Sequence, residues 1–219
     1  MEGHIRDLYE VEGAFYQYTN KGKSYLCRRL AVIQAKESTY QEHYDALFIM
    51  VNPGSCQPLD SSYNVPVIQT LSDSVPLVKA KSDPTQRQLM RVMAEQKWNK
   101  TAIFNLSDLC EGNLSKFSEL MKSCRHSFPH HSIFSDERAK ELQNLFLQNR
   151  GPVIVAWGTN SCISDLAKKA LFTLQMNDIE YMGKPYANYP YYYHANPHLQ
   201  SMKQEWLEYM SEQLQARSV

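Results

Sequence analysis

Asparagine side chains follow three apolar segments of this sequence and open a fourth segment, which is polar. They are Asn52 after residues 45–51, Asn105 after 101–104, Asn160 after 153–157, and Asn196, which is followed by Pro197, His198 and Leu199. A carboxamide offers both a hydrogen-bond donor and an acceptor, which suits the edge of a nucleobase better than a phosphate or a metal ion. For any one of these asparagines the capping of a turn is a sufficient explanation, whereas four at corresponding places favour a binding site.

The apolar segments must bring these asparagines together. Residues 45–51 form a continuous apolar run closed by Asn52-Pro53-Gly54, as expected of a strand buried on both faces. Similar strand candidates are residues 101–104, 153–157 and 179–182. Amphipathic helices are predicted at about 83–98, 135–148, 161–174 and 199–214. Strands that alternate with helices predict parallel βαβ units, and the carboxyl ends of such strands form the ligand-binding edge of an open sheet.

We therefore expect a single α/β domain over residues 1–219, with three α/β/α layers around a mostly parallel central sheet of about four strands. Its core is predicted over about 45–216, preceded by an N-terminal β-hairpin over about 14–34. A long polar loop, residues 55–82, follows the first core strand, and loops of this length are usually functional or disordered. Asp83-Pro84 is a typical helix start, so a cap is a more common role for Asp83 than an acid.

The composition excludes several classes of function. The 23 Lys and Arg balance the 23 Asp and Glu, which argues against a protein that coats DNA through bulk positive charge, although a local basic groove remains compatible. Five cysteines without a Cys-x-x-Cys pair lack zinc-site spacing and indicate reduced thiols. His130-His131 has no companion ligand and is predicted to lie in a solvated loop. No signal pattern and no apolar run of ~20 residues is present, so we expect a cytoplasmic protein without a membrane partner.

Two further features each have two interpretations. Lys21, Lys23 and Arg28 of the hairpin are candidates for contacts with DNA phosphates, and a solvated charged hairpin is the alternative. Five of the 14 tyrosines lie between residues 186 and 193 and lead into the Asn196 segment. They would either stack on bases or pack together as a loop.

The four segments resemble motifs of the uracil-DNA glycosylase superfamily. Met50-Val-Asn-Pro-Gly54 is similar to the Gly-Ile-Asn-Pro-Gly form of the mismatch-specific branch, and Thr101–Leu106 resembles the strand whose terminal Asn reads a flipped uracil. Val153–Gly158 resembles the strand that enters the superfamily's Leu-Trp-Gly segment. Asn196-Pro-His-Leu199 is similar to the last motif, His-Pro-Ser or Asn-Pro-Ser followed by leucine. The resemblance implies a uracil-DNA-glycosylase-like fold.

A second resemblance is equally good. The motifs Asn-Pro-Gly, Asp-Pro-Thr, Asn-Leu and Ala-Trp-Gly, in this order, look like those of an uncharacterised bacterial family, a domain of unknown function. Together the two resemblances cover about residues 45 to 200. Each motif is short, and their order and their places at successive strand ends carry the comparison.

The first resemblance implies roles for the site residues. Asn52 would position a water molecule, Asn105 would read the base edge, and His198 would stabilise the leaving base or clamp a phosphate. Leu199 would be the wedge that fills the space of a base flipped out of the duplex. The remaining assignments are Pro53, Gly54 and Tyr63 to the base pocket, and Asn196 and Pro197, beside Leu199, to DNA contact.

Three departures from that superfamily alter the expected chemistry. Many of its fast enzymes have Asp where this chain has Asn52, and an amide cannot act as a general base, so slower chemistry is expected. His198 stands where Ser is usual. Gly54 replaces the Tyr that excludes 5-substituted pyrimidines from the strict uracil enzymes, and its absence predicts that a bulkier base is admitted.

These observations predict a hydrolase, a DNA glycosylase that leaves an abasic site after excising a modified or deaminated base. Its role would be DNA repair, or antiviral defence if the base is a bulky modified pyrimidine of phage DNA. The chemistry requires no metal and no cofactor, DNA is the expected partner, and a monomer is expected. Two alternatives remain: a non-catalytic nucleic-acid or nucleotide binding module on the same fold, which Asn52 in place of Asp favours, and an enzyme that acts on free nucleosides or nucleotides.

Overall fold

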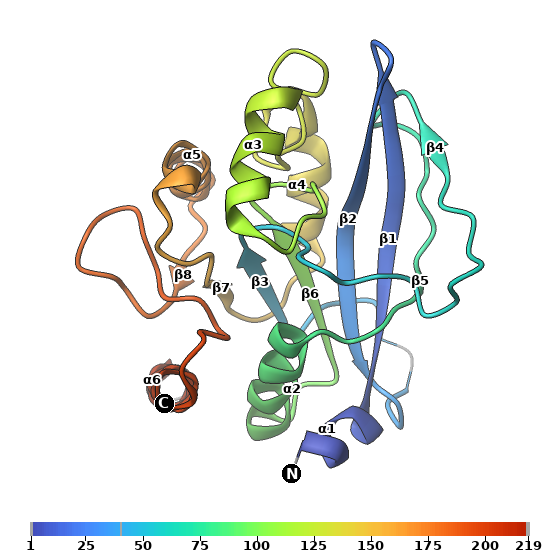
Figure 1. Cartoon of the computed structure of the whole chain (residues 1–219). Helices are drawn as coiled ribbons and strands as arrows, with labels where there is room; N and C mark the ends of the chain where they lie inside the picture. The colour runs from blue at the N-terminus through green and yellow to red at the C-terminus, as the bar shows by residue number, and fades with distance from the viewer. Residues whose placement is uncertain (1, 40, 218–219) are drawn as a thin grey trace.

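A computed structural model of the chain describes residues 2–39 and 41–217, and one sheet with helices on both faces dominates it (Figure 1). The strands are β1 (Tyr9–Asn20), β2 (Lys23–Ala35), β3 (Ala46–Met50), β4 (Val67–Ile68), β5 (Val78–Lys79), β6 (Lys100–Asn105), β7 (Val153–Val155) and β8 (Tyr181–Met182). The helices are α1 (Glu2–Leu8), α2 (Pro84–Gln96), α3 (Leu114–Cys124), α4 (Ala139–Leu147), α5 (Ser164–Met176) and α6 (Gln200–Arg217), with 3-10 turns at Asp136–Arg138 and Ser161–Ile163.

The strand order is β4-β1-β2-β6-β3-β7-β8, and β5 also pairs with β1. The four predicted core strands are β6, β3, β7 and β8, and they are parallel as expected. The expected count of about four is wrong, because the sheet in the described chain has eight strands. The hairpin is longer than predicted, and its strand β2 pairs antiparallel with β6, so it is part of the same sheet. Apolar side chains on both faces of β2 explain this, since they need cover on two sides.

Helices α3, α4 and α5 cover one face of the sheet and α1, α2 and α6 cover the other, in the upper and lower parts of Figure 1. Successive side chains of β3 alternate between these layers. Leu47 and Ile49 pack against the first set of helices, and Phe48 and Met50 against the second. Each such burial contributes about 1.5–3 kcal/mol. The continuous apolar run therefore reflects a strand that is buried on both faces.

Helix α2 begins as the sequence predicts. Asp83 caps it by accepting a hydrogen bond from the backbone N–H of Gln86 at 2.8 Å, while the Gln86 side chain accepts from the Asp83 N–H. Helix α3, which begins after the cap residue Asn113, is not predicted from the sequence, because only Phe117 and Cys124 of it are buried. None of the helices in the described ranges has an apolar stretch that could cross a membrane.

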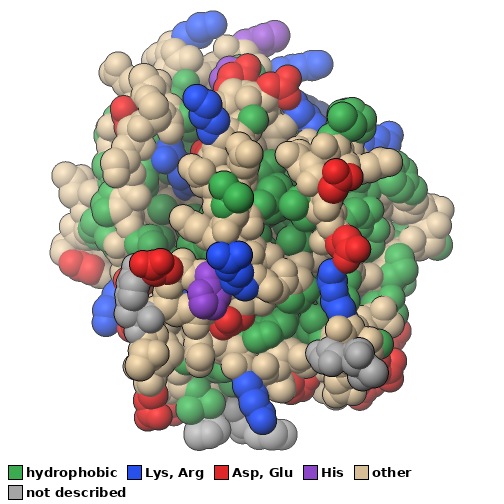
Figure 2. Space-filling model, turned by 180° about the vertical axis from the view of Figure 1, so that it is seen from behind, with side chains coloured by type: hydrophobic (Ala, Val, Ile, Leu, Met, Phe, Trp, Pro, Cys, Tyr) green, Lys and Arg blue, Asp and Glu red, His purple; other side chains and the backbone are tan. Residues whose placement is uncertain are grey.

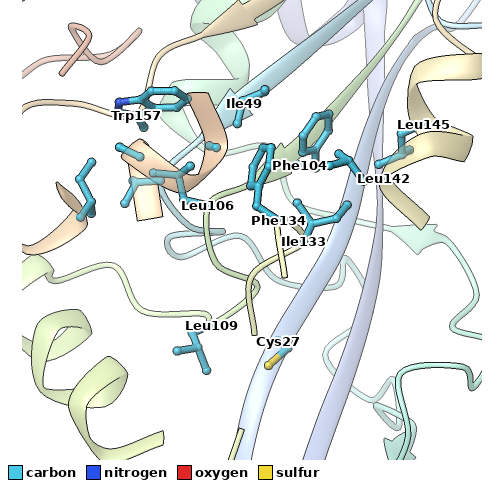
Figure 3. Packing of buried hydrophobic residues seen from close by; sticks show 14 of the residues in the cluster. Cys27, Ile49, Phe104, Leu106, Leu109, Ile133, Phe134, Leu142, Leu145 and Trp157 are labelled. Atoms are coloured by element: carbon cyan, nitrogen blue, oxygen red, sulfur yellow. The ribbon is translucent and has the colours of Figure 1, made fainter. Parts of the chain in front are cut away.

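A buried ion pair holds the segment that follows β6. Arg138 lies 2.8 Å from the carboxylate of Asp108, which also accepts a hydrogen bond of 2.7 Å from the hydroxyl of Tyr16. Glu141 accepts two more hydrogen bonds from Arg138. In the core layer on this face of the sheet, Phe104 of β6 lies near Phe134 and near Leu142 and Leu145 of α4, as Figure 3 shows. Burial raises the pKa of Asp108 to about 6, against the opposing effect of Arg138.

The pair His130-His131 does not lie wholly in a solvated loop. His130 is exposed enough to pair with Glu137, but His131 is only 8% exposed and contacts the Ser107 hydroxyl at 2.8 Å through Nδ1. Burial, together with the nearby charges of Arg138 and His130, lowers the pKa of His131 to about 4. The prediction for His131 is therefore wrong, because the ring is a buried neutral member of the core.

We predict that Arg138→Met lowers the free energy of unfolding by about 3–5 kcal/mol, because it leaves the Asp108 carboxylate buried without its cation. Urea unfolding of the full chain measures the change. The control is Arg217→Met, which removes the exposed pair with Glu180 and should change stability by less than about 1 kcal/mol. Adding Asp108→Leu to Arg138→Met should recover part of the loss; an equal loss in single and double variants would contradict the assignment.

A second prediction concerns pH. Because the folded pKa of His131 lies below its ordinary value of 6.5, the unfolded chain binds more protons as the pH falls from about 6.5 to about 4. Stability due to His131 is thus present above this window and is lost through it, by about 3 kcal/mol. Asp108 has the opposite effect, since its pKa is raised, so the comparison must be with His131→Gln. Urea unfolding at several pH values should show a smaller loss for the variant, and an NMR titration of His131 near its ordinary pKa would refute the prediction.

Candidate functional site

The order of the parallel strands creates a switch point at their carboxyl ends. The chain leaves β3, passes through α2 and returns as β6 on one side of β3, and then crosses through α3 and α4 to β7 on the other side. Ligands of open α/β sheets bind in the crevice where the connections diverge in this way. A cleft of about 800 Å³ lies at this edge, and the ends of β3, β6 and β7 all contribute to it.

The cleft combines apolar and polar side chains. Its apolar lining includes Met50, Ile103, Leu114, Ile163, Trp157 and Met202, and its polar lining includes Arg28, Asn52, Asp83, Gln86, Asn105, Thr159, Asn160, His194, Asn196 and His198. The structure therefore brings together the four segments whose asparagines the sequence singled out. Among the described residues, no group of three or more His, Cys, Asp or Glu side chains is arranged to hold a metal ion.

Asn105 is fully buried where β6 ends, and it lines the cleft. Among the residues that the structure describes, neither its Nδ2 nor its Oδ1 has a hydrogen-bond partner. The backbone after it is fixed, because Leu106 donates to the carbonyl of Met50 and Ser107 to that of Val51. Buried carboxamides are normally satisfied, and leaving one unpaired costs about 1–3 kcal/mol. A ligand that offers an acceptor and a donor would remove this cost.

Asn52 is half-buried, and its amide nitrogen is engaged. Nδ2 donates to the carbonyl oxygens of Leu109 at 3.4 Å and Glu111 at 2.5 Å. These bonds set the orientation of the amide and leave Oδ1 as an acceptor on a residue that lines the cleft. Two residues later, Gly54 has a φ of +63°, and a side chain there would meet nothing within 4 Å. The left-handed backbone accounts for the glycine, and the space beside it is open to a ligand.

The three candidate DNA-contact residues of the hairpin do not lie together. Arg28 lines the cleft and is only 2% exposed. Lys21 and Lys23, at the tip of the hairpin, donate instead to the carbonyls of His126 and Ser123 beyond and at the end of α3. The cleft meets α3 at its other end, near Leu114, so the two lysines do not line it.

The other predicted residues lie as follows. Pro53, Asn196, Pro197 and His198 line the cleft. Leu199, the predicted wedge, comes directly after them and is 62% exposed. Tyr63 lies in the loop between β3 and β4 and is not among the lining residues. The tyrosines between 186 and 193 also divide, because Tyr186 and Tyr193 line the cleft, whereas Tyr192 packs edge-on against Trp157.

Sequence reasoning did not assign a role to His194. Its Nδ1 accepts a hydrogen bond of 3.1 Å from the backbone N–H of Asn196, so in the neutral ring Nε2 carries the proton. Burial lowers the pKa of His194, while nearby Asp83 raises it and His198 lowers it. The ring thus supplies a neutral N–H donor at the cleft. Its place between the tyrosine cluster and the Asn196 segment was the signal in the sequence.

Asp83, the cap of α2, also lines the cleft. It is the one carboxylate among the described residues that line the cleft. It is therefore the cleft's candidate general base, whereas the sequence favoured the cap alone. Trp157, which is 2% exposed, donates from Nε1 to the carbonyl of Pro190 at 3.1 Å and so contacts the loop that contains the tyrosine cluster.

The fold and the site define an α/β protein with a ligand cleft at the switch point of its sheet. Comparisons with models of known families, with curated proteins and with solved structures give no match. The interpretation therefore rests on the geometry of the cleft.

The orphaned carboxamide makes a prediction about stability. Asn105→Leu should raise the free energy of unfolding by about 1–2 kcal/mol, because it replaces an unpaired buried amide with an apolar side chain of similar size. The control is Gln88→Leu: Gln88 is 1% exposed, but it donates to Lys203 and accepts from Arg91. That substitution should destabilise the protein. Urea unfolding measures both, and a clear loss of stability in Asn105→Leu would show that Asn105 is structural.

Proposed function

We propose that the protein is a DNA glycosylase that hydrolyses the N-glycosidic bond of a modified or deaminated base flipped into the cleft. The observation that carries this proposal is Asn105, a buried carboxamide that lines the cleft and whose two polar atoms have no partner among the described residues. A base edge presents donors and acceptors side by side in the plane of a ring, which is the pattern that one carboxamide can pair with. The resemblance of the four strand-end motifs to the uracil-DNA glycosylase superfamily supports the same function.

The shape of the cleft also suits a base. Met50, Ile103 and Trp157 supply apolar surface beside Asn105. Tyr186 and Tyr193 add aromatic side chains of the kind that stack on unstacked bases. At about 800 Å³ the cleft exceeds a single base, so it has room for a substituent or for the attached sugar.

The reaction would use groups already in place. Water attacks C1′ of the sugar, the bond from C1′ to the base nitrogen breaks, and the bonding electrons leave with the base. Oδ1 of Asn52 would orient the water, and the Asp83 carboxylate would accept its proton. The Nε2–H of His194, beside exposed His198, would stabilise the negative charge on the departing base. No step requires a metal or a cofactor.

The surface suits brief contact with one nucleotide. Lys and Arg side chains are interspersed with Asp and Glu on the face that Figure 2 shows, and hydrophobic side chains lie between them. The net charge is zero. Leu199, which is exposed and follows the cleft residue His198, would occupy the gap left by a flipped base. Few phosphate contacts would make binding depend only weakly on salt.

One observation favours the alternative of a binding module that keeps the base intact. Nδ2 of Asn52 donates to two backbone carbonyls, so support of residues 109–111 is by itself a sufficient role for this side chain. A binding module would use Asn105 in the same way and would release no base.

The prediction is that the protein forms abasic sites in DNA that contains the right base. Duplex and single-stranded oligonucleotides with uracil or with large 5-substituted cytosines are incubated with the protein and then cleaved with alkali. Because Asn105 would form its contacts with the base as the bond breaks, Asn105→Ala should reduce the rate by about 100-fold or more. Asp83→Asn should also lower the rate of base excision by about 100-fold, because it removes the general base.

The matched control is Asn64→Ala, which changes an exposed asparagine outside the cleft and should retain full activity. Abasic sites that persist in the Asn105 and Asp83 variants would point to another active site. Binding to such DNA without any abasic site would favour the binding module, and turnover of free nucleosides with weak DNA binding would favour a nucleoside enzyme. Activity on uracil alone would refute the prediction from Gly54 that bulkier bases are admitted.

A further inference from the structure

Arg28 is a buried cation without a counter-ion. Its side chain is inside the protein at 2% exposure, and Nε and Nη1 have no hydrogen-bond partner. No ion pair joins it to a carboxylate within residues 2–39 and 41–217. Arg138, equally buried, shows the usual solution, because it contacts two carboxylates. A buried charge without such partners is costly unless a ligand supplies the opposite charge.

The Arg28 side chain projects from the face of the sheet that α2 covers. Arg28 pairs across the hairpin with Phe15, and Asn105 comes two residues after Ile103; Phe15 and Ile103 both belong to the layer that α2 covers. Arg28 and Asn105 therefore project from the same face of the sheet, and both line the cleft. Its neighbour Arg29 projects from the opposite face, where it pairs with Glu141.

The hairpin is shaped around this side chain. The pairing of β1 with β2 is interrupted by an irregularity between Gly13 and Phe15, opposite Arg28. A Cβ on Gly13 would lie 3.3 Å from Cδ of Arg28 and 2.5 Å from the ring of Phe15. The missing side chain thus gives room to the stem of Arg28 and to the aromatic ring beside it.

Neighbouring groups do not neutralise the cation. Burial raises the pKa of Cys110 to about 12, although Arg28 lowers it, so this thiol stays protonated and neutral. The Asp83 carboxylate lines the same cleft, where it caps α2, and forms no ion pair with Arg28 within the described chain. Arg28 is the unsatisfied positive charge of the cleft.

We propose that Arg28 makes the cleft specific for a ligand that has an anionic oxygen group, a carboxylate or a phosphate, next to the base edge bound by Asn105. The inference rests on the proposed function in that it takes the ligand to be a base or nucleotide. Two sources of the group share this chemistry: an acidic substituent on the base, and the phosphate of the nucleotide. Arg28 is then a specificity residue, and it acts in the cleft rather than on the outer DNA backbone as the hairpin's charge pattern suggested.

The test measures binding of small probes to the full chain by calorimetry. One pair is 5-carboxyuracil and its neutral 5-carboxamide; the other is deoxyuridine 5′-monophosphate and deoxyuridine. Since hydrogen bonds to charged groups are the stronger ones, the wild-type protein should prefer the acidic member of at least one pair by about 10- to 100-fold. Preference in the first pair identifies a substituent on the base, and preference in the second identifies the phosphate.

Arg28→Met should reduce the preference to about 1-fold, whereas the matched control Arg29→Met, on the opposite face of β2, should keep it. Arg28→Met should also raise the melting temperature, because it removes an unpaired buried charge, so a folded variant is expected. Equal binding of acidic and neutral probes by the wild-type protein, no binding of any acidic probe, or a preference that survives Arg28→Met would overturn the proposal.

The two proposals fail separately. An Arg28-dependent preference without any abasic site in DNA would leave the anion-binding role standing and overturn the glycosylase. If wild type and Arg28→Met form abasic sites equally fast from neutral bases, the glycosylase stands and the anion-binding role of Arg28 is overturned.

Discussion

The buried pair of Asp108 and Arg138 is the interaction on which the rest of the site depends. It ties the segment that follows β6 to the turn before α4, and the hydroxyl of Tyr16 ties the same carboxylate to the hairpin. The cost of burying two charges is offset here by hydrogen bonds to both partners. These contacts join the segment after β6 to both the hairpin and the start of α4.

The segment of residues 106–111 also contacts residues that line the cleft. Its carbonyl groups at Leu109 and Glu111 accept from Asn52, and the carbonyl of Asp108 accepts from the backbone N–H of Arg28. These backbone groups have their hydrogen-bond partners within the fold. By contrast, within the part of the chain that the structure describes, both amide atoms of buried Asn105 and the Nε and Nη1 atoms of buried Arg28 have no hydrogen-bond partner. In the proposed function, the backbone contacts would support the site and these side-chain atoms would bind the ligand, as preorganisation of a binding site requires.

The sequence indicates the parallel core well, for a physical reason. Strands buried on both faces need continuous apolar runs, and turn residues such as Asn52-Pro53-Gly54 mark where each run ends. The same pattern predicts that Asn105 and the Asn196 segment meet in one cleft. The two-residue strands β4 and β5 are too short for any periodicity, and the pairing of β2 with β6 depends on contacts between distant residues.

The sequence is least informative about which charged or titratable side chains are buried. On the sequence Arg28 belongs with Lys21 and Lys23, as three cations on one hairpin. Whether a cation is solvated or buried depends on which face of a strand it occupies and on what lies across that face, and the irregularity at Gly13 decides this for Arg28. His131 is a similar case, since its ring contacts Ser107, 24 residues earlier in the chain, and no local pattern indicates that contact.

The same reasoning sharpens the meaning of zero net charge. A protein whose positive charge is balanced on its surface gains little from a long phosphate backbone. An unpaired guanidinium in a low-dielectric cleft interacts more strongly with one anionic group than many exposed lysines do with screened phosphates. Selectivity in this molecule would then arise from two buried side chains, Asn105 for the base edge and Arg28 for charge, while the surface contributes little attraction of its own.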